Sequence, residues 1–323
     1  MQYDLTAIGE LLIDFVPNGC ADNGVQQFGA NPGGAPANVC AISAKLGDHV
    51  AFIGKVGTDP FGVLLRNTLQ KNHISTEGLI MDPTTLTTLT FVTLDECGER
   101  DFCFYRKNSA DTMLRPDELN WNILSNSKFL HFGSLSLTNE PSRSATFEAV
   151  TYAKTAGCII SYDPNYRPAL WGNAHIAIDM MLRGVVLADI LKVSEEEAVL
   201  LSGSEDIAQS AQILADMGPS VIIITCGSRG AYYHTNGGTG MVPGFNVEVI
   251  DTTGAGDTFI GSFLHYVKKK TLEEINTLKN KEMEEIVQKC NAAAAITTTG
   301  LGAIASMPTV EQLHYFLTEK ITQ

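Results

Sequence analysis

A glycine-rich turn stands near the end of the chain, in the segment Asp251-Thr252-Thr253-Gly254-Ala255-Gly256-Asp257-Thr258-Phe259. Before it, residues 245–250 alternate apolar and polar side chains, which predicts a strand. After it, the apolar residues of 260–267 recur at i, i+3, i+4 and i+7, which is one face of a helix. The turn therefore opens a helix, and the amide groups and dipole of that helix start would attract an anion such as a phosphate.

Asp257 is an unexpected residue at an anion site, because a carboxylate is repelled by a phosphate. A base that removes a hydroxyl proton beside a phosphate belongs at this place, and we expect Asp257 to have that role. The alternative is an acid in the first turn that only complements the helix dipole.

The whole segment resembles the C-terminal signature of the ribokinase-like (PfkB) carbohydrate kinases. In that family the Asp is the catalytic base, and the backbone amides before it form an anion hole for the phosphate that moves. The resemblance implies these roles for Asp257 and for Gly254, Ala255 and Gly256.

The bulk composition excludes several classes of protein. The chain has 323 residues and a net charge of −14, which argues against a nucleic acid or an anionic membrane as partner. Its seven cysteines are scattered and form no C-x-x-C pair, so neither a zinc site nor a disulfide framework is indicated. We find no signal peptide and no apolar run long enough to cross a bilayer, and we expect a cytoplasmic protein.

A second glycine-rich run, residues 29–38, precedes a predicted helix at 37–46. It resembles the N-terminal signature of the same family, in which the Gly-Gly pair and the following Asn hold sugar hydroxyls. The resemblance assigns Gly33, Gly34 and Asn38 to the sugar, and family precedent adds Asp14. Asp14 follows a predicted first strand at 3–9 and would be costly to bury without a partner or ligand, although a turn or edge Asp is the alternative.

Residues 80–107 are rich in Thr, Val and Phe, with a predicted hairpin turn at 96–99. In the family, such segments form a small β-sheet that closes over the sugar and excludes water. The resemblance implies a lid made of residues 11–30 and 80–107, with Phe104 and Arg106 beside the sugar. An exposed lid edge invites a second subunit, so we expect a homodimer through the lid.

From residue 108 onward, predicted strands at 129–132, 158–162, 189–193 and 221–225 alternate with helical patterns. This alternation is typical of a parallel sheet, whose functional residues gather at the carboxyl ends of the strands. The string from Asp163 to Trp171 resembles that of fructokinases and 2-keto-3-deoxygluconate kinases, which places Arg167 by the sugar or phosphate. A structural salt bridge is the other interpretation of Arg167.

The nucleotide and ion sites follow from the resemblance. Ser194 and Glu197 have the spacing of a capping box, and they also stand where the family has an Asn-x-x-Glu motif that organises Mg²⁺ through water. Ser194 replaces the commoner Asn. Residues 297–306 are predicted to form a flexible loop that, with the Asp-Thr-Thr segment, holds K⁺ mostly through backbone oxygens. The resemblance thus implies nucleotide contacts from Lys192, Ser194, Glu197, Thr225, Gly227, Gly230 and Asn291, and a K⁺ site at Asp251, Thr253, Thr297, Gly302 and Ser306.

These observations predict one α/β domain over residues 1–323, a ribokinase-like three-layer sandwich with a mostly parallel central sheet and a small β-sheet lid. The expected reaction is ATP- and Mg²⁺-dependent phosphorylation of a primary hydroxyl, with D-fructose giving fructose 6-phosphate. A 2-keto-3-deoxygluconate kinase is the nearest alternative, since Arg106 and Arg167 could clamp a carboxylate, although Phe104 stands where a Tyr is expected there. Ribokinase, a nucleotide-binding protein with another acceptor, and a sugar sensor without turnover are further alternatives.

Overall fold

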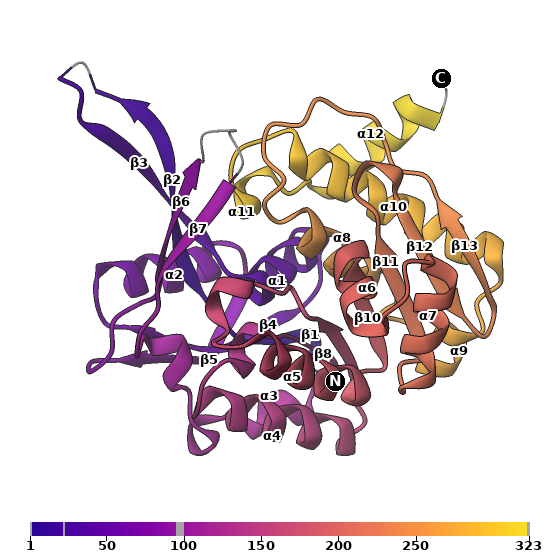
Figure 1. Ribbon diagram of the computed structural model, residues 1–323, viewed down its shortest axis with the longest axis horizontal. Coiled ribbons are helices and arrows are strands. Elements are labelled where there is room, and N and C mark those ends of the chain that lie inside the picture. The colour runs from indigo at the N-terminus through magenta and orange to yellow at the C-terminus, as the bar shows by residue number, and fades with distance from the viewer. Residues whose placement is uncertain (1, 22, 95–99, 322–323) are drawn as a thin grey trace.

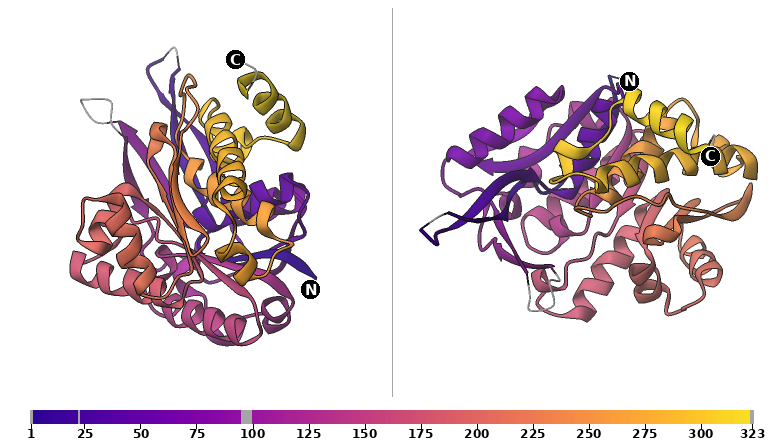
Figure 2. Two further views of the ribbon diagram at one scale, coloured as in Figure 1. Left: turned by 90° about the vertical axis from the view of Figure 1, so that its right-hand side faces the viewer. Right: turned by 90° about the horizontal axis from the view of Figure 1, so that it is seen from above.

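A nine-stranded sheet lies between two layers of helices (Figures 1 and 2) in the computed structural model, which describes residues 2–21, 23–94 and 100–321. Seven adjacent strands are parallel, and the last two strands of the sheet are antiparallel to their neighbours. The predicted strands at 3–9, 129–132, 158–162, 189–193 and 221–225 are confirmed. In spatial order the strands are β13 (Gly238–Val242), β12 (Ala231–Thr235), β11 (Val221–Thr225), β10 (Ile190–Ser194), β9 (Ile159–Asp163), β8 (Ser127–Gly133), β1 (Tyr3–Ile8), β4 (Val50–Gly57) and β5 (Ile74–Asp82).

Helices cover both faces of this sheet, which explains why its central strands are continuous apolar runs such as Val221-Ile222-Ile223-Ile224. One face packs against α3 (Trp121–Ser125), α4 (Ser142–Thr155), α5 (Ala174–Leu187), α6 (Glu195–Ser202) and α7 (Ile207–Asp216). The other packs against α1 (Ala35–Lys45), α2 (Pro60–Lys71), α8 (Ala255–Val267), α9 (Leu272–Asn276), α10 (Asn280–Thr298), α11 (Ala303–Ser306) and α12 (Val310–Ile321). The three layers that the sequence predicts are therefore present.

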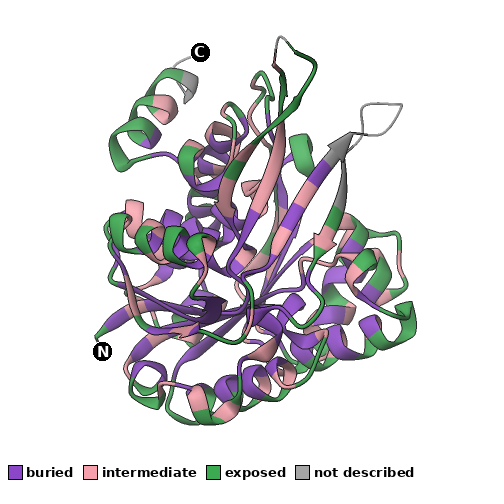
Figure 3. Ribbon diagram, turned by 90° about the vertical axis from the view of Figure 1, so that its left-hand side faces the viewer, coloured by how far each residue is buried: buried purple, intermediate pink, exposed green. Residues whose placement is uncertain are grey.

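A small four-stranded sheet projects from the large one (Figure 1). Two of its strands come from residues 12–33 and two from 89–105, so the two segments that we expected to form a lid lie side by side. Its strands are less buried than the central strands of the large sheet (Figure 3). The order is β3 (Gln26–Gly33), β2 (Leu12–Cys20), β6 (Leu89–Leu94) and β7 (Arg100–Tyr105), with β2 and β6 parallel and the other pairs antiparallel.

Two predictions of local structure are wrong, the second of them in part. Residues 245–250 form no strand, because their apolar side chains Val247 and Val249 face a cavity and do not join a sheet. Residues 297–306 form a loop only at 299–302, since Thr297 and Thr298 complete α10 and Ala303–Ser306 forms α11. The predicted turn at 96–99 lies outside the described residues.

Candidate active site

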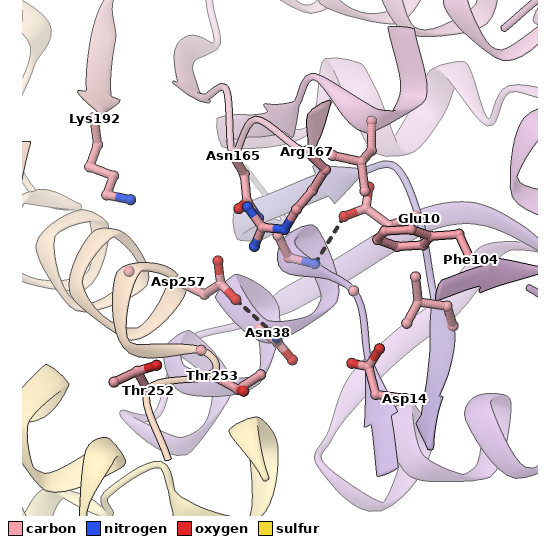
Figure 4. A pocket seen from close by; sticks show the side chains of 16 residues that line it. Glu10, Asp14, Asn38, Phe104, Asn165, Arg167, Lys192, Thr252, Thr253 and Asp257 are labelled. Atoms are coloured by element: carbon pink, nitrogen blue, oxygen red, sulfur yellow. Dashed lines mark hydrogen bonds between the residues drawn. The ribbon is translucent and has the colours of Figure 1, made fainter. Parts of the chain in front are cut away.

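The carboxyl ends of the central strands, the start of α8 and the small sheet enclose a cavity of about 300 Å³, called the first cavity here (Figure 4). It is lined by residues from both signatures, which lie more than 200 positions apart in the chain. Its polar lining residues are Glu10, Asp14, Asn38, Asn165, Arg167, Lys192, Thr252, Thr253 and Asp257.

Asp257 lies in the first turn of α8 and is 8% exposed. Its Oδ2 accepts a hydrogen bond from Nδ2 of Asn38, at 2.8 Å, which joins the C-terminal signature to the N-terminal one. Burial raises the pKa of the Asp257 carboxyl to about 6, even though the Asn38 hydrogen bond favours its charged form. At pH 7 the carboxyl is therefore about 90% ionised and can take a proton.

The turn before Asp257 requires glycine at its first position. Gly254 has φ of 81°, and a Cβ there would lie 2.6 Å from the Cβ of Ala303. The Ala255 N–H donates to the Thr252 carbonyl at 3.2 Å, so this predicted anion-hole amide already serves the turn. The amides of Gly256 and Asp257 precede the first helical hydrogen bond, from Thr258 N to Gly254 O, and they are the donors best placed for an anion.

The buried ammonium group of Lys192 lies beside this turn. Lys192 Nζ lies 2.8 Å from Oδ2 of Asp163; Lys192 is in β10, and Asp163 is the last residue of the neighbouring β9. Burial by itself lowers the Lys192 pKa, but Asp163 and Glu197 outweigh burial and raise it above its ordinary value, so the ammonium stays charged. A Cβ on Gly256 would lie 2.8 Å from Lys192 Nζ, so the glycine gives the cation room beside the helix start.

A second cavity, of about 270 Å³, adjoins the first, and the two share Thr252 and Gly256 in their linings. The first turn of α8 therefore stands between them. Apolar residues, among them Val247 and Phe259, make up much of the second cavity. The residues that the resemblance assigned to the nucleotide and that line it are Thr225, Gly227, Gly230 and Asn291. Asn291 Nδ2 also donates to the carbonyls of Val242 and Pro243, which holds the segment before Val247 in place.

Ser194 and Glu197 form the predicted capping box at the start of α6. Glu197 Oε2 accepts from Ser194 N at 2.8 Å, and its Oε1 accepts from Tyr166 N at 2.6 Å. Burial and the neighbouring Asp163 raise the pKa of Glu197. Because both carboxylate oxygens already accept backbone hydrogen bonds, the residue fits an indirect contact to Mg²⁺ through water better than direct ligation.

The predicted K⁺ residues lie close together around Asp251. Asp251 is 3% exposed, and its carboxylate accepts from Thr253 N at 2.8 Å and from Gly302 N at 3.1 Å. Ser306 Oγ donates to the Gly302 carbonyl, and Thr297 Oγ1 lies 3.1 Å from the hydroxyl of Thr258 in α8. Asp251 thus ties the segment before α8 to the start of α11. The described residues contain no cluster of three His, Cys, Asp or Glu side chains of the kind that binds a metal.

Most predicted sugar residues line the first cavity: Asp14, Gly34, Asn38, Phe104 and Arg167. Gly33 stands just behind this lining, and a Cβ on it would lie 2.5 Å from Oδ2 of Asp14. Burial raises the pKa of the Asp14 carboxyl to about 6.

Arg106 does not line the cavity. It is 7% exposed, and its guanidinium pairs with Oδ2 of Asp111 at 2.6 Å and donates to the Leu135 carbonyl at 2.9 Å. The alternation of residues 102, 104 and 106 predicted one shared face, but β7 ends at Tyr105 and the chain turns directly after Arg106, at residues 107–108. The expected contact of Arg106 with the sugar is therefore wrong, and its observed role is a buried structural ion pair.

Three polar lining residues were not assigned from the sequence: Glu10, Asn165 and Thr252. Glu10 follows the first strand, so the rule that function gathers at carboxyl ends of strands could have found it. Asn165 lies two residues after the end of β9 and has φ of 45°, a backbone conformation that Asn tolerates better than most residues.

A buried carboxylate, a helix start that suits an anion, a charged lysine and two adjoining cavities are the features of a phosphotransferase that acts on a small hydroxylated acceptor. The model of the pfkB family of carbohydrate kinases matches residues 2–310, and the chain belongs to this family.

Relatives of known description agree with this assignment. Fructokinase-2 of Oryza sativa subsp. japonica is 43% identical over 312 residues, which cover 95% of this chain and 91% of that protein. The crystal structure of the Xylella fastidiosa fructokinase with bound ATP matches with a TM-score of 0.91 and 30% identity, over 99% of both chains. A double mutant of the Vibrio cholerae fructokinase, in its fructose-, ADP- and potassium-bound form, matches with a TM-score of 0.86 and 35% identity, over 98% of this chain and 99% of that one.

Among the residues that the structure describes, no helix combines the length and the apolar character that crossing a membrane requires.

Proposed function

We propose that this chain is a fructokinase, which transfers the γ-phosphoryl group of ATP to the 6-hydroxyl of D-fructose. One observation carries the proposal: the first cavity, with Asp257 in its wall, adjoins the second cavity at the anion-binding turn of α8. A sugar in the first cavity and ATP in the second would meet at Gly256 and Lys192. The names of the relatives support fructose as the acceptor.

The residues of the site suit each part of the reaction. Asp257 takes the proton of the attacking hydroxyl, and Asn38 holds the Asp257 carboxylate toward the sugar. The amides at the start of α8 and the ammonium of Lys192 stabilise the charge that develops on the transferring phosphoryl group. Mg²⁺, when bound with ATP, neutralises phosphate charge, and Glu197 would orient its water ligands.

The position of Arg106 favours fructose over a keto acid. A carboxylate of 2-keto-3-deoxygluconate would be clamped by two arginines, but Arg106 is committed to Asp111 and only Arg167 lines the first cavity. A neutral sugar needs no such clamp, because hydrogen-bonding groups such as those of Asp14 and Asn38 suffice for hydroxyls.

We also propose K⁺ at the residues around Asp251, supported by the potassium named for the Vibrio cholerae fructokinase.

The six cysteines that the structure describes are free thiols, which suits a reducing compartment such as the cytoplasm.

Assembly as a homodimer through the small sheet stays a prediction, which light scattering would test. Phe28 and Tyr105 on that sheet, and Val25 just before β3, are 40%, 62% and 56% exposed and would supply apolar contact area.

A coupled assay of ADP formation tests the proposal with fructose, 2-keto-3-deoxygluconate, ribose and adenosine as acceptors. We expect kcat/KM for fructose to exceed that for each other acceptor by at least about 100-fold, because a poorly matched acceptor leaves buried polar groups of the site unpaired. Preferred turnover of another acceptor would replace fructose and keep the kinase chemistry. Sugar binding without turnover on any acceptor would identify a sugar sensor.

A further inference from the structure

Glu10 is a buried carboxyl in the wall of the first cavity, and the mechanism above does not use it. It connects β1 to β2 and is 2% exposed. Its Oε1 accepts from the Ala35 N–H, at 3.0 Å, at the start of α1. Its Oε2 is buried and has no hydrogen-bond partner among the described residues. Such an atom costs free energy unless a ligand or water satisfies it.

A second unsatisfied atom lines the same cavity. Asn38 donates through Nδ2 to Asp257, while its Oδ1 is buried and lacks a partner in the described part of the chain. Two orphan oxygens in one polar cavity indicate a ligand that carries several hydroxyl groups, since each hydroxyl can donate one hydrogen bond and accept others. Asn38 was assigned to the sugar from sequence, whereas Glu10 was not.

The charges around Glu10 leave its carboxyl without a dedicated counterion. Arg106 and Asp111, the charged groups that act on the Glu10 carboxyl, form an ion pair with each other at 2.6 Å. Burial raises the pKa of Glu10 to about 7, despite the Arg106 charge. Near neutral pH the carboxyl is thus present in both forms, and Oε2 can either donate to or accept from a sugar hydroxyl.

The position of Glu10 decides which end of the sugar it meets. Glu10, Phe104 and Asp14 lie on one side of the cavity, and Asp257 and Lys192 lie on the opposite side (Figure 4). Because Asp257 takes the 6-hydroxyl proton, the Glu10 side receives the far end of the furanose ring, which carries the C1 and C2 hydroxyls.

We propose that Glu10 is a specificity-determining residue, whose Oε2 hydrogen-bonds the C1 or C2 hydroxyl of the ketose. The inference rests on the proposed phosphorylation of fructose.

The test compares fructose with two analogues, 1-deoxy-D-fructose, which lacks the C1 hydroxyl, and 2,5-anhydro-D-mannitol, which lacks the C2 hydroxyl. The wild type is expected to prefer fructose over one of them by about tenfold or more in kcat/KM, as one lost hydrogen bond in a buried site predicts. Glu10→Met has a similar length but makes neither hydrogen bond. In this variant KM for fructose should rise about tenfold or more, and the preference should fall below about threefold.

Glu118→Gln is the matched control, because Glu118 accepts from Lys55 Nζ at 2.8 Å and lies outside the lining of the first cavity. It should keep the wild-type preference. If Glu10→Met does not fold, Glu10→Asp replaces it, since its carboxyl is drawn back by about 1.5 Å and should also lose the preference.

A Glu10 variant that turns over fructose and keeps the wild-type preference overturns the inference alone and leaves Glu10 as an acceptor for the Ala35 N–H. A wild type that does not use fructose overturns the proposed function, and the assignment to C1 or C2 with it.

Discussion

Replacing Asp257 by Asn should make the enzyme much less active and, at the same time, more stable. The amide cannot take a proton, so kcat should fall by about 10²- to 10⁴-fold, the range that a general base contributes. The amide oxygen can still accept from Asn38 Nδ2, so the local geometry is kept. Activity of the variant within tenfold of the wild type would refute the role of Asp257 as the base.

The gain in stability follows from the pKa of Asp257. The native structure raises this pKa from 3.8 to about 6, which corresponds to roughly 3 kcal/mol of destabilisation once the carboxyl is ionised in both the folded and the unfolded state. The penalty develops as pH rises from about 4 to about 6 and stays constant above that range. Asp257→Asn should therefore increase the free energy of unfolding by up to roughly 3 kcal/mol at pH 7, and by almost nothing below pH about 4.

Urea unfolding at pH 7 and at pH 4 measures the stability difference, and a coupled ADP assay from pH 5 to 8 measures activity. The wild-type kcat/KM should fall tenfold per pH unit below a midpoint of about 6, the pKa of the base. The variant should lose this fall of kcat/KM at low pH. A variant that is less stable than the wild type at pH 7, or that keeps the same fall at low pH, would contradict the account of a desolvated base.

Three further predictions concern the surroundings of the base, a structural ion pair and the cation. Asn38→Ala removes a hydrogen bond that favours the charged form of Asp257, so the acid midpoint of the kcat/KM profile should move above 6; an unchanged midpoint would contradict the contact. Arg106→Met leaves Asp111 buried without its partner and should cost about 3 to 5 kcal/mol in urea unfolding. Arg115→Met, at a side chain that is 53% exposed, should cost at most about 1 kcal/mol, and equal costs would refute the structural role of Arg106. Replacing K⁺ by choline should lower kcat reversibly, and a rate independent of K⁺ would remove the proposed cation site.

Much of this site could be predicted from local sequence, because the residue types within each signature are enough to indicate its local structure. The Gly-Ala-Gly turn before an amphipathic segment predicts a helix start, and the helix start predicts an anion site, without reference to the rest of the chain. The apolar runs of β8 to β11 likewise predict buried parallel strands.

Local sequence patterns gave wrong predictions where the fold determines the surroundings of a side chain. Val247 and Val249 alternate as in a strand, but they line the second cavity. Arg106 follows the alternation of β7, yet the end of that strand and the carboxylate of Asp111 direct it away from the first cavity. The cavity at Val247 and Val249 is formed by separate elements, so a short window does not show it. Asp111 stands only five positions after Arg106, but the Arg106 guanidinium also donates to the distant Leu135 carbonyl.

Residue types at short spacing were enough to predict the fold class, the two signatures and Asp257 as the expected base. The environment of Asp257, by contrast, depends on the tertiary structure. The fold brings Asn38 to Asp257 across 219 positions of the chain and buries the carboxyl, which moves its pKa toward the working pH. It also places Glu10 in the same cavity with one oxygen unsatisfied. Burial and long-range hydrogen bonds depend on contacts between segments that are far apart in the chain, so a short stretch of sequence cannot predict them.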